Sequence, residues 1–270
     1  MNQPDLESGE QAQAQKMAGA RPSVIYESIR TEGQHQLSRT FGALWWSGVA
    51  AGLAISISVL CKGFLVAFLP DATWTPVVSN LGYTVGFLIV ILGRMQLFTE
   101  NTITPILSLL LEPTRVNLEC TARLWAIVFA ANMLGSLVAA GAIVNANIVP
   151  PLQFEGVLAV ARHFAAASAV EHLMWGIPAG FLIAALVWIL PRMDGAGEIL
   201  VIVIITYVIG LGGLSHVVAG SSELFILVFH GELGLGEAIG RGIFPAFVGN
   251  VIGGTGMFAA LTYAQVRDEV

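Results

Sequence analysis

Charged residues are scarce in this chain. Asp, Glu, Lys and Arg make up only 11% of its 270 residues, whereas hydrophobic residues make up 56%. A soluble domain usually carries about a quarter charged residues, so this composition cannot cover a water-exposed surface of the required size. The scarcity of charge excludes a soluble globular protein and predicts an all-α membrane protein that crosses the bilayer several times.

Signals for catalysis, metals and nucleotides are also missing. The only two cysteines, Cys61 and Cys120, lie in or near different apolar segments and predict neither a disulfide framework nor a metal site. The sequence has no His-Glu-x-x-His run for zinc, no Gly-x-x-x-x-Gly-Lys loop for nucleotides and no Gly-x-Ser-x-Gly elbow for a serine hydrolase. We therefore expect no enzyme activity, no cofactor, no metal and no nucleic-acid partner.

The chain contains instead six long apolar segments after about residue 40. We predict transmembrane segments at 42–69, 76–111, 123–147, 169–190, 199–229 and 240–264. The second and fifth exceed the length that one membrane helix needs, and polar residues interrupt them near 97–104 and 212–221. Irregular backbone within a membrane must be buried in protein or line a watery path, so the two interruptions predict passage of a small polar solute.

The predicted domain organisation has three parts. Residues 1–40 are polar, contain no apolar core of a signal peptide, and form a cytoplasmic N-terminal segment, partly disordered with a short amphipathic helix. Residues 41–265 form the six-helix transmembrane channel domain, and 266–270 a cytoplasmic tail. Lys and Arg are more numerous on the side that holds the N-terminus, which predicts that both termini are cytoplasmic. We also hypothesise that the N-terminal segment gates the inner mouth.

The two halves of the transmembrane region repeat one another. Asn132 and Asn250 occupy corresponding places in the third and sixth segments, each at the same distance after an arginine, Arg123 or Arg241. A repeat of three segments must enter the membrane with opposite orientation, because three is odd. This predicts an inverted 3+3 repeat whose two broken helices meet near the midplane.

His216, in the second interruption, is the sharpest candidate for chemistry. An ionisable residue inside a membrane indicates function, and imidazole can exchange a proton with a weak-acid anion near neutral pH or hydrogen-bond to it. The alternative is a histidine that merely ties two helices together. Thr99, in the first interruption, is its predicted partner or a ligand for the solute, because a hydroxyl both donates and accepts. Alternatively, Thr99 caps the following half-helix.

Four further residues near the interruptions have open roles. Glu100 and Glu223 would attract cations or protons if they faced the path, but we favour helix-start carboxylates hydrogen-bonded to backbone amides. Asn132 and Asn250 are expected to hold the interruptions in shape by bonding freed backbone groups. Gly220 is expected to supply backbone freedom at the second break.

Taken together, Leu97-Phe98-Thr99, His216, Asn132-x-x-Gly135, Asn250-x-x-Gly253 and the order of six segments resemble the formate/nitrite transporter family. The resemblance covers about residues 40–265 and points to a less characterised branch from the bacterial cytoplasmic (inner) membrane. It implies an aquaporin-like protomer in a homopentamer, each subunit with its own pore. It also implies that His216 and Thr99 bind or protonate a small monovalent anion.

The resemblance further implies two apolar slits on either side of the histidine. By position, Tyr83, Phe87 and Ile209 would form the cytoplasmic slit, and Leu97 and Phe98 would lie near the centre and the outer slit. The chain departs from better-known members in four places. Glu100 replaces a serine, Gly220 and Gly180 each replace an asparagine, and Phe164 lies near the position of an anion-attracting lysine.

The function we expect is a channel or secondary transporter for a small monovalent weak-acid anion, formate- or nitrite-like, linked to protons through His216. Its partners are the lipid bilayer, further copies of itself in a homopentamer, and the solute. Three alternatives stay open: the same fold passing a neutral or cationic solute, an intramembrane hydrolase using Ser221 or Ser222, and a scaffold without a working pore.

Overall fold

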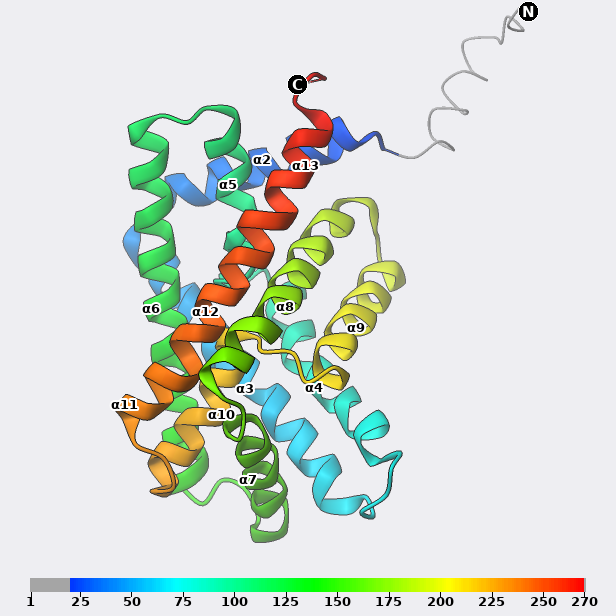
Figure 1. Ribbon diagram of the computed structural model, residues 1–270, viewed down its shortest axis with the longest axis vertical. Helices are drawn as coiled ribbons and strands as arrows, with labels where there is room; N and C mark the ends of the chain where they lie inside the picture. The colour runs from blue at the N-terminus through cyan, green and yellow to red at the C-terminus, as the bar shows by residue number, and fades with distance from the viewer. Residues whose placement is uncertain (1–19, 270) are drawn as a thin grey trace, which may run out of the picture.

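The computed structural model describes residues 20–269 and is all-helical in that range. The disorder expected in part of residues 1–40 falls mostly outside that range. In chain order the helices are α2 (Pro22–Ser38), α3 (Phe41–Phe68), α4 (Thr75–Leu92), α5 (Thr104–Leu111), α6 (Arg115–Asn145), α7 (Pro151–Ala165), α8 (Ala169–Ile189), α9 (Ala196–Leu211), α10 (Val217–His230), α11 (Leu235–Glu237), α12 (Phe244–Val251) and α13 (Ala260–Val266). Figure 1 shows α2 and α13 at one end of the molecule, the α2 end, and α7 at the opposite end, the α7 end.

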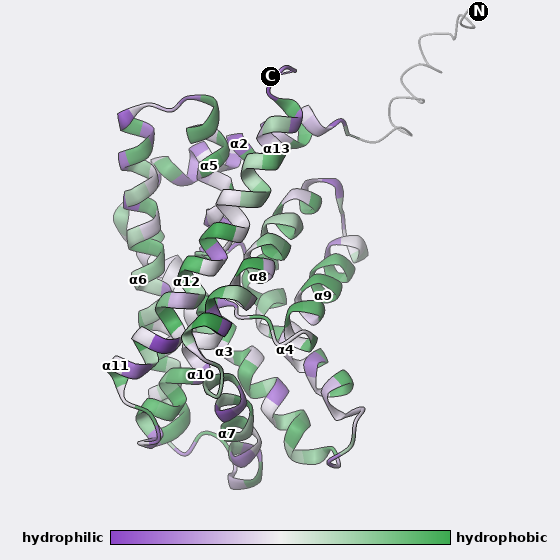
Figure 2. Cartoon of the chain, in the orientation of Figure 1, coloured by the Kyte–Doolittle hydropathy of each residue, from purple (hydrophilic) through white to green (hydrophobic). Residues whose placement is uncertain are grey.

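Within the described range, five helices are long and apolar enough to cross a membrane: Phe41–Phe68, Thr75–Leu92, Arg115–Asn145, Ala169–Arg192 and Leu235–Val266. The last of these joins α11, α12 and α13 through π-helical turns at Ala238–Ile243 and Ile252–Ala259. Two shorter apolar helices, α9 and α10, occupy the segment predicted at 199–229. Figure 2 shows hydrophobic residues along most of α6, α8 and α9, with hydrophilic residues gathered at the helix ends and loops.

Local capping explains where several of these helices begin. Thr40 and Thr114 accept hydrogen bonds from the backbone amides three residues on, at the starts of α3 and α6. Ser168 and Glu171 form a reciprocal capping box at the start of α8. Each arrangement satisfies amides that have no partner inside the helix. Helix α7 was not predicted, because its sequence lies between two proposed membrane segments and was treated as a connection.

Two helix pairs pack with unusually close backbones. A side chain at Gly52 of α3 would run into the carbonyl oxygen of Asn132 in α6. In the same way, a side chain at Gly180 of α8 would run into the carbonyl oxygen of Asn250 in α12. Small residues permit this approach between membrane helices. The close contact brings the two asparagines beside the interruptions of the neighbouring segments.

Helix α2 lies across the α2 end and packs on α5. The hydroxyl of Tyr26 donates to the carbonyl oxygen of Leu107 at 2.7 Å, and the hydroxyl of Thr104 donates to Gln36 Oε1 at 2.8 Å. Gly33 has no room for a side chain, because the Thr104 carbonyl lies against its Cα. These buried contacts attach α2 to the half-helix that follows the first interruption.

Candidate functional site

The chain leaves regular helix twice near the centre of the molecule, after α4 and after α9. Both helices end in a Schellman motif, with a left-handed residue that turns the backbone away from the helix axis. That residue is Arg94 (φ 48°) in the first case and Gly213 (φ 61°) in the second. In each case the next amide returns to a carbonyl of the last turn at 3.0 Å, Met95 N to Val90 O and Leu214 N to Ile209 O.

Asn132 holds the first interruption through three buried hydrogen bonds. Its Oδ1 accepts from the amide of Phe98 at 2.8 Å. Its Nδ2 donates to the carbonyl oxygens of Gly48 at 2.8 Å and Gln96 at 2.9 Å. The side chain is fully buried. Its bonds to Phe98 and Gln96 supply partners to backbone groups that have left the helix, and its bond to Gly48 ties the interruption to α3.

Asn250 makes the same three bonds in the other half. Its Oδ1 accepts from the amide of Val217 at 2.9 Å. Its Nδ2 donates to the carbonyl oxygens of Gly176 and Ser215, both at 2.8 Å. The two fully buried asparagines thus hold the two interruptions in the same way.

The two interruptions meet at His216 and Thr99. His216 Nε2 lies 2.8 Å from the Thr99 hydroxyl, and both side chains are fully buried. His216 also caps α10, because its Nδ1 accepts from the amide of Ala219 at 3.3 Å. A nitrogen that accepts from an amide carries no proton, so in the neutral ring the proton is on Nε2. His216 therefore donates to Thr99, whose own hydroxyl hydrogen is left to reach another acceptor.

Aromatic residues of α4 cover one side of this pair. The Phe87 ring meets the His216 ring edge-on, with centroids 4.9 Å apart, and Tyr83 lies one turn away with its centroid 5.3 Å from that of Phe87. Ile209 is fully buried near the end of α9. Tyr83 precedes Phe87 by one turn in α4 and also lines an open cavity. The assignment of Tyr83, Phe87 and Ile209 to a cytoplasmic slit stays a prediction.

Leu97 and Phe98 of the first interruption are also fully buried. The Phe98 ring packs among Trp125, Phe129 and Phe247, with centroid distances of 5.6, 5.1 and 5.0 Å. The indole of Trp125 donates to the carbonyl oxygen of Asn101 at 2.8 Å, which further fixes this stretch of chain. Phe98 thus contacts α6 and α12, whereas Phe87 is the aromatic side chain against His216.

The placement of Gly220 and Glu223 corrects an expectation, because both lie inside α10 and not in the break. The second interruption ends at His216, which is the residue that caps the helix. A side chain at Gly220 would run into the ring of Phe164 from α7. Its small size therefore makes room for Phe164, and backbone freedom is not required there.

Glu100 and Glu223 do not make the contacts that we favoured, in which each carboxylate bonds to backbone amides at the start of a helix. Glu100 lies in the short turn Glu100–Thr102, and its Oε1 is buried with no hydrogen-bond partner among residues 20–269. Glu223 sits beyond the first turn of α10 and borders an open cavity. Neither forms an ion pair within 4.0 Å in the described part of the chain.

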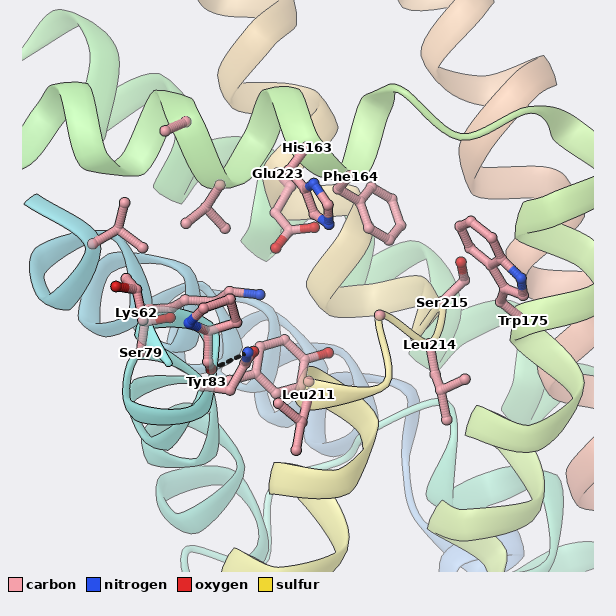
Figure 3. A pocket seen from close by; sticks show the side chains of 18 of the residues that line it. Lys62, Ser79, Tyr83, His163, Phe164, Trp175, Leu211, Leu214, Ser215 and Glu223 are labelled. Atoms are coloured by element: carbon pink, nitrogen blue, oxygen red, sulfur yellow. Dashed lines mark hydrogen bonds between the residues drawn. The ribbon is translucent and has the colours of Figure 1, made fainter. Parts of the chain in front are cut away.

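The cavity lies among α3, α4, α7, α8, α9 and α10 on the α7 side of His216 and has a volume of about 300 Å³. Its polar lining includes Lys62, Asn80, Tyr83, His163 and Glu223 (Figure 3). The cavity extends to Ser215, the neighbour of His216. The hydroxyl of Ser215 lies 3.0 Å from Nδ1 of His172. Sequence analysis did not gather these residues, although a lone lysine in an apolar segment was a signal for one of them.

The two serines proposed for a hydrolase are engaged elsewhere. Ser221 Oγ donates to the carbonyl oxygen of Val217 at 2.6 Å, and Ser222 Oγ lies 2.8 Å from Ser56 Oγ. Neither hydroxyl bonds to His216, whose Nε2 is paired with Thr99. The geometry therefore offers no nucleophile and base pair here. Nor do residues 20–269 contain a group of three His, Cys, Asp or Glu side chains that could hold a metal ion.

The chain is similar to known membrane transport proteins over most of its length. The sequence model described as "Formate/nitrite transporter" matches residues 23–264. The chain is 38% identical over 251 residues to "Inner membrane protein YfdC" of Escherichia coli (strain K12), covering 93% of this chain and 81% of that protein. It is 26% identical over 252 residues to "Formate channel BtFdhC" of Bacillus thuringiensis, covering 92% and 95%.

Two solved structures share the fold at 17% sequence identity. An "FNT family ion channel" superposes with a TM-score of 0.79 and covers 89% of this chain and 98% of its own. A "Pentameric formate channel with formate bound" superposes with a TM-score of 0.72 and covers 86% and 100%. The helical arrangement described above is therefore that of a known channel fold.

Proposed function

The chain belongs to the formate/nitrite transporter family, and on that premise we propose that it carries a small monovalent weak-acid anion across the bacterial cytoplasmic (inner) membrane. This family comprises channels and transporters, not enzymes. The proposed solute is of the kind of formate or nitrite, since one relative is named a formate channel. The name of a second relative, an inner membrane protein, supports the proposed location.

The observation that carries the proposal is the fully buried pair of His216 and Thr99 at 2.8 Å, held where the two interruptions meet. A small anion beside this pair would accept from the free hydrogen of the Thr99 hydroxyl. Moving a bare anion through an apolar constriction is very costly, whereas its neutral acid passes far more cheaply. A residue that can deliver a proton at this depth therefore solves the main energetic problem of the path.

The ring of His216 can deliver that proton only after taking one from outside. Protonation at Nδ1 displaces the amide of Ala219, so the doubly protonated ring gives up one of its bonds. Transfer of one proton from the cationic ring to the bound anion restores the neutral ring and yields the neutral acid. This cycle links each passage of solute to one proton.

We propose that six membrane segments form an inverted 3+3 repeat in an aquaporin-like protomer. Five long helices and the consecutive short helices α9 and α10 are consistent with six segments. The matching Schellman motifs and the matching bonds of Asn132 and Asn250 support two equivalent broken helices. The proposed homopentamer has support from a solved structure with this fold, whose title names a pentameric channel.

The proposed orientation places both termini, and hence the α2 end, in the cytoplasm. Helix α2 then lies at the inner mouth and is bonded to α5 through Tyr26 and Thr104. This contact gives the N-terminal segment a means to act on the first interruption, because α5 directly follows it. The open cavity lies, in this orientation, on the outer side of His216.

A neutral or cationic solute remains the second candidate, and a specific observation favours it. Glu223 borders the cavity without a partner within ion-pair distance among the described residues, and Glu100 is unpaired near the first interruption. An ionised carboxylate on the path repels anions and attracts cations. Replacing either residue by its amide separates the two candidates, since anion flux rises if the carboxylate opposes it.

The test is flux of formate and nitrite into proteoliposomes at about pH 5.5 and about pH 7.5, on either side of the usual range of histidine titration. His216→Ala is expected to abolish the pH dependence and most of the flux. His35→Ala, at an exposed position of α2, is the matched control and is expected to behave like the native protein. Flux that is unchanged in His216→Ala would overturn the role of the histidine.

A further inference from the structure

We propose that the open cavity is a binding site for a small zwitterion, such as a small amino acid, that carries an anionic and a cationic group. This site goes beyond the proposed transport of a weak-acid anion, because neither His216 nor Thr99 lines the cavity. Figure 3 shows Lys62 and Glu223 extending into the cavity from different walls. The site therefore presents both signs of charge around one space.

The ammonium group of Lys62 has no carboxylate partner among residues 20–269. Its nearest described interaction is with the face of the Tyr83 ring, 5.8 Å from Nζ to the centroid. Glu223, only 4% exposed, likewise makes no ion pair or hydrogen bond in that range, so its oxygens are free to face the cavity. Two opposite charges thus border one cavity without a direct ion pair.

Asn80 supplies an independent sign of a missing ligand. Its side chain is 3% exposed, and its Nδ2 donates to the carbonyl oxygen of Pro76 at 2.7 Å. That bond fixes the orientation of the amide, which leaves Oδ1 as the other end. Oδ1 is buried and has no hydrogen-bond partner in the described residues, and Asn80 lines the cavity. This oxygen lies beside Gly210 of α9 in the cavity wall. A buried acceptor without a donor is costly, so a ligand N–H group that reaches it by a small shift of this wall gains a bond.

A simple anion or a simple cation fits these groups poorly. An anion pairs with Lys62 but is repelled by Glu223 and offers no hydrogen to Asn80. A cation pairs with Glu223 and Asn80 but is repelled by Lys62. A zwitterion satisfies all three groups, with its acid group toward Lys62 and its ammonium group toward Glu223 and the Asn80 oxygen.

The remaining walls set the size and character of the ligand. A volume of about 300 Å³ is at the lower end of small-molecule sites, which suits a molecule of a few heavy atoms. Phe164 and Trp175 contribute aromatic surface, and Val66, Val160 and Leu214 contribute aliphatic surface. Aromatic faces also attract an ammonium group. An amino acid with a small apolar side chain therefore matches the lining.

The experiment is equilibrium binding to the full chain, purified in detergent and reconstituted in nanodiscs, with glycine and alanine as probes. Acetate and methylammonium serve as the two half-ligands. We expect saturable binding of the amino acids and at least about tenfold weaker binding of each half-ligand, because each leaves a buried polar group unpaired. Glu223→Gln and Lys62→Met are each expected to weaken amino-acid binding by a similar factor. Glu155→Gln, at an exposed position of α7, is the matched control with native binding.

Two further variants show whether lost binding reflects misfolding and whether binding is independent of the proposed transport. The double variant Lys62→Glu with Glu223→Lys restores both charges and is expected to recover part of the binding. His216→Ala is expected to retain binding although it loses formate flux, so each proposal can fail without the other. Acetate that binds as tightly as glycine, or no saturable binding of either amino acid to the native protein, would overturn the proposal.

Discussion

The two buried asparagines offer the most direct test of how the interruptions are held. Substituting Asn250 by Leu preserves approximate volume but removes an acceptor and two donors. The amide of Val217 and the carbonyl oxygens of Gly176 and Ser215 then lose their bonds of 2.8 to 2.9 Å. Asn132→Leu removes the corresponding bonds in the other half.

The magnitude follows from the number of buried groups left without partners. Side-chain hydrogen bonds in a membrane protein average about 0.6 kcal/mol, so three bonds set a lower bound of about 2 kcal/mol. Gly48 and Gly176 lie inside helices, so in each half two backbone groups of the interruption are left without a partner. Each costs roughly 1–3 kcal/mol, which raises the expected loss to about 4 kcal/mol. The smaller energy assumes that the same groups find other partners in the unfolded state. The larger energy assumes that the interruption stays rigid in the variant. We expect a loss of free energy of unfolding between these values for each variant.

The assay is equilibrium unfolding in mixed micelles with Asn145→Leu as the control. Asn145, at the exposed end of α6, makes one side-chain bond to the carbonyl oxygen of Gly141 at 3.0 Å. Its loss is expected to cost less than about 0.5 kcal/mol, as usual for exposed positions. An Asn250 or Asn132 variant that loses no more stability than this control would refute the reasoning. A large loss in only one of them would refute the equivalence of the two halves.

Two other predictions concern contacts of α7 with α10 and with the turn that follows α10. Gly220→Val should lower thermal stability, because the valine side chain overlaps the ring of Phe164. Adding Phe164→Ala should restore part of that stability. No recovery in the double variant would show that the ring is not the obstacle. Outside the membrane helices, the bidentate bonds of Arg162 and then the neighbouring His230 lower the pKa of Glu232 from 4.5 to about 2. Because its pKa is depressed, this carboxylate stabilises the fold above pH 4.5 and loses that effect as pH falls toward 2. In Glu232→Gln the free energy of unfolding should therefore fall less steeply with pH in that window. Identical pH profiles for the two proteins would contradict this.

The pairing of His216 and Thr99 could be predicted from the sequence, because polar residues are rare within apolar segments. A histidine and a threonine within apolar segments stand out, and the repeat suggested that their two interruptions meet. The 2.8 Å separation of His216 Nε2 and Thr99 Oγ1 agrees with the predicted partnership. The two asparagines were found by the same repeat, since equal spacing from an arginine marks equivalent positions.

Other features depend on information that the sequence does not carry locally. The end of the second break was placed too late, because His216 itself caps α10 and no glycine or proline marks that boundary. Helix α7 was missed because its short apolar pattern resembles a connection. The convergence of Lys62 and Glu223 on one cavity depends on how α3 packs against α10.

The differences between the two halves carry more functional information than their likeness. Equivalent asparagines and equivalent Schellman motifs hold both interruptions, so that part of the design is structural and shared. The first interruption leads into α5, which bonds to α2 at one end of the molecule. The second leads from the cavity at the other end through Ser215 to His216. Corresponding asparagines thus hold both interruptions, while the residues around the two interruptions differ: α2 and α5 on one side, and the cavity with Lys62 and Glu223 on the other.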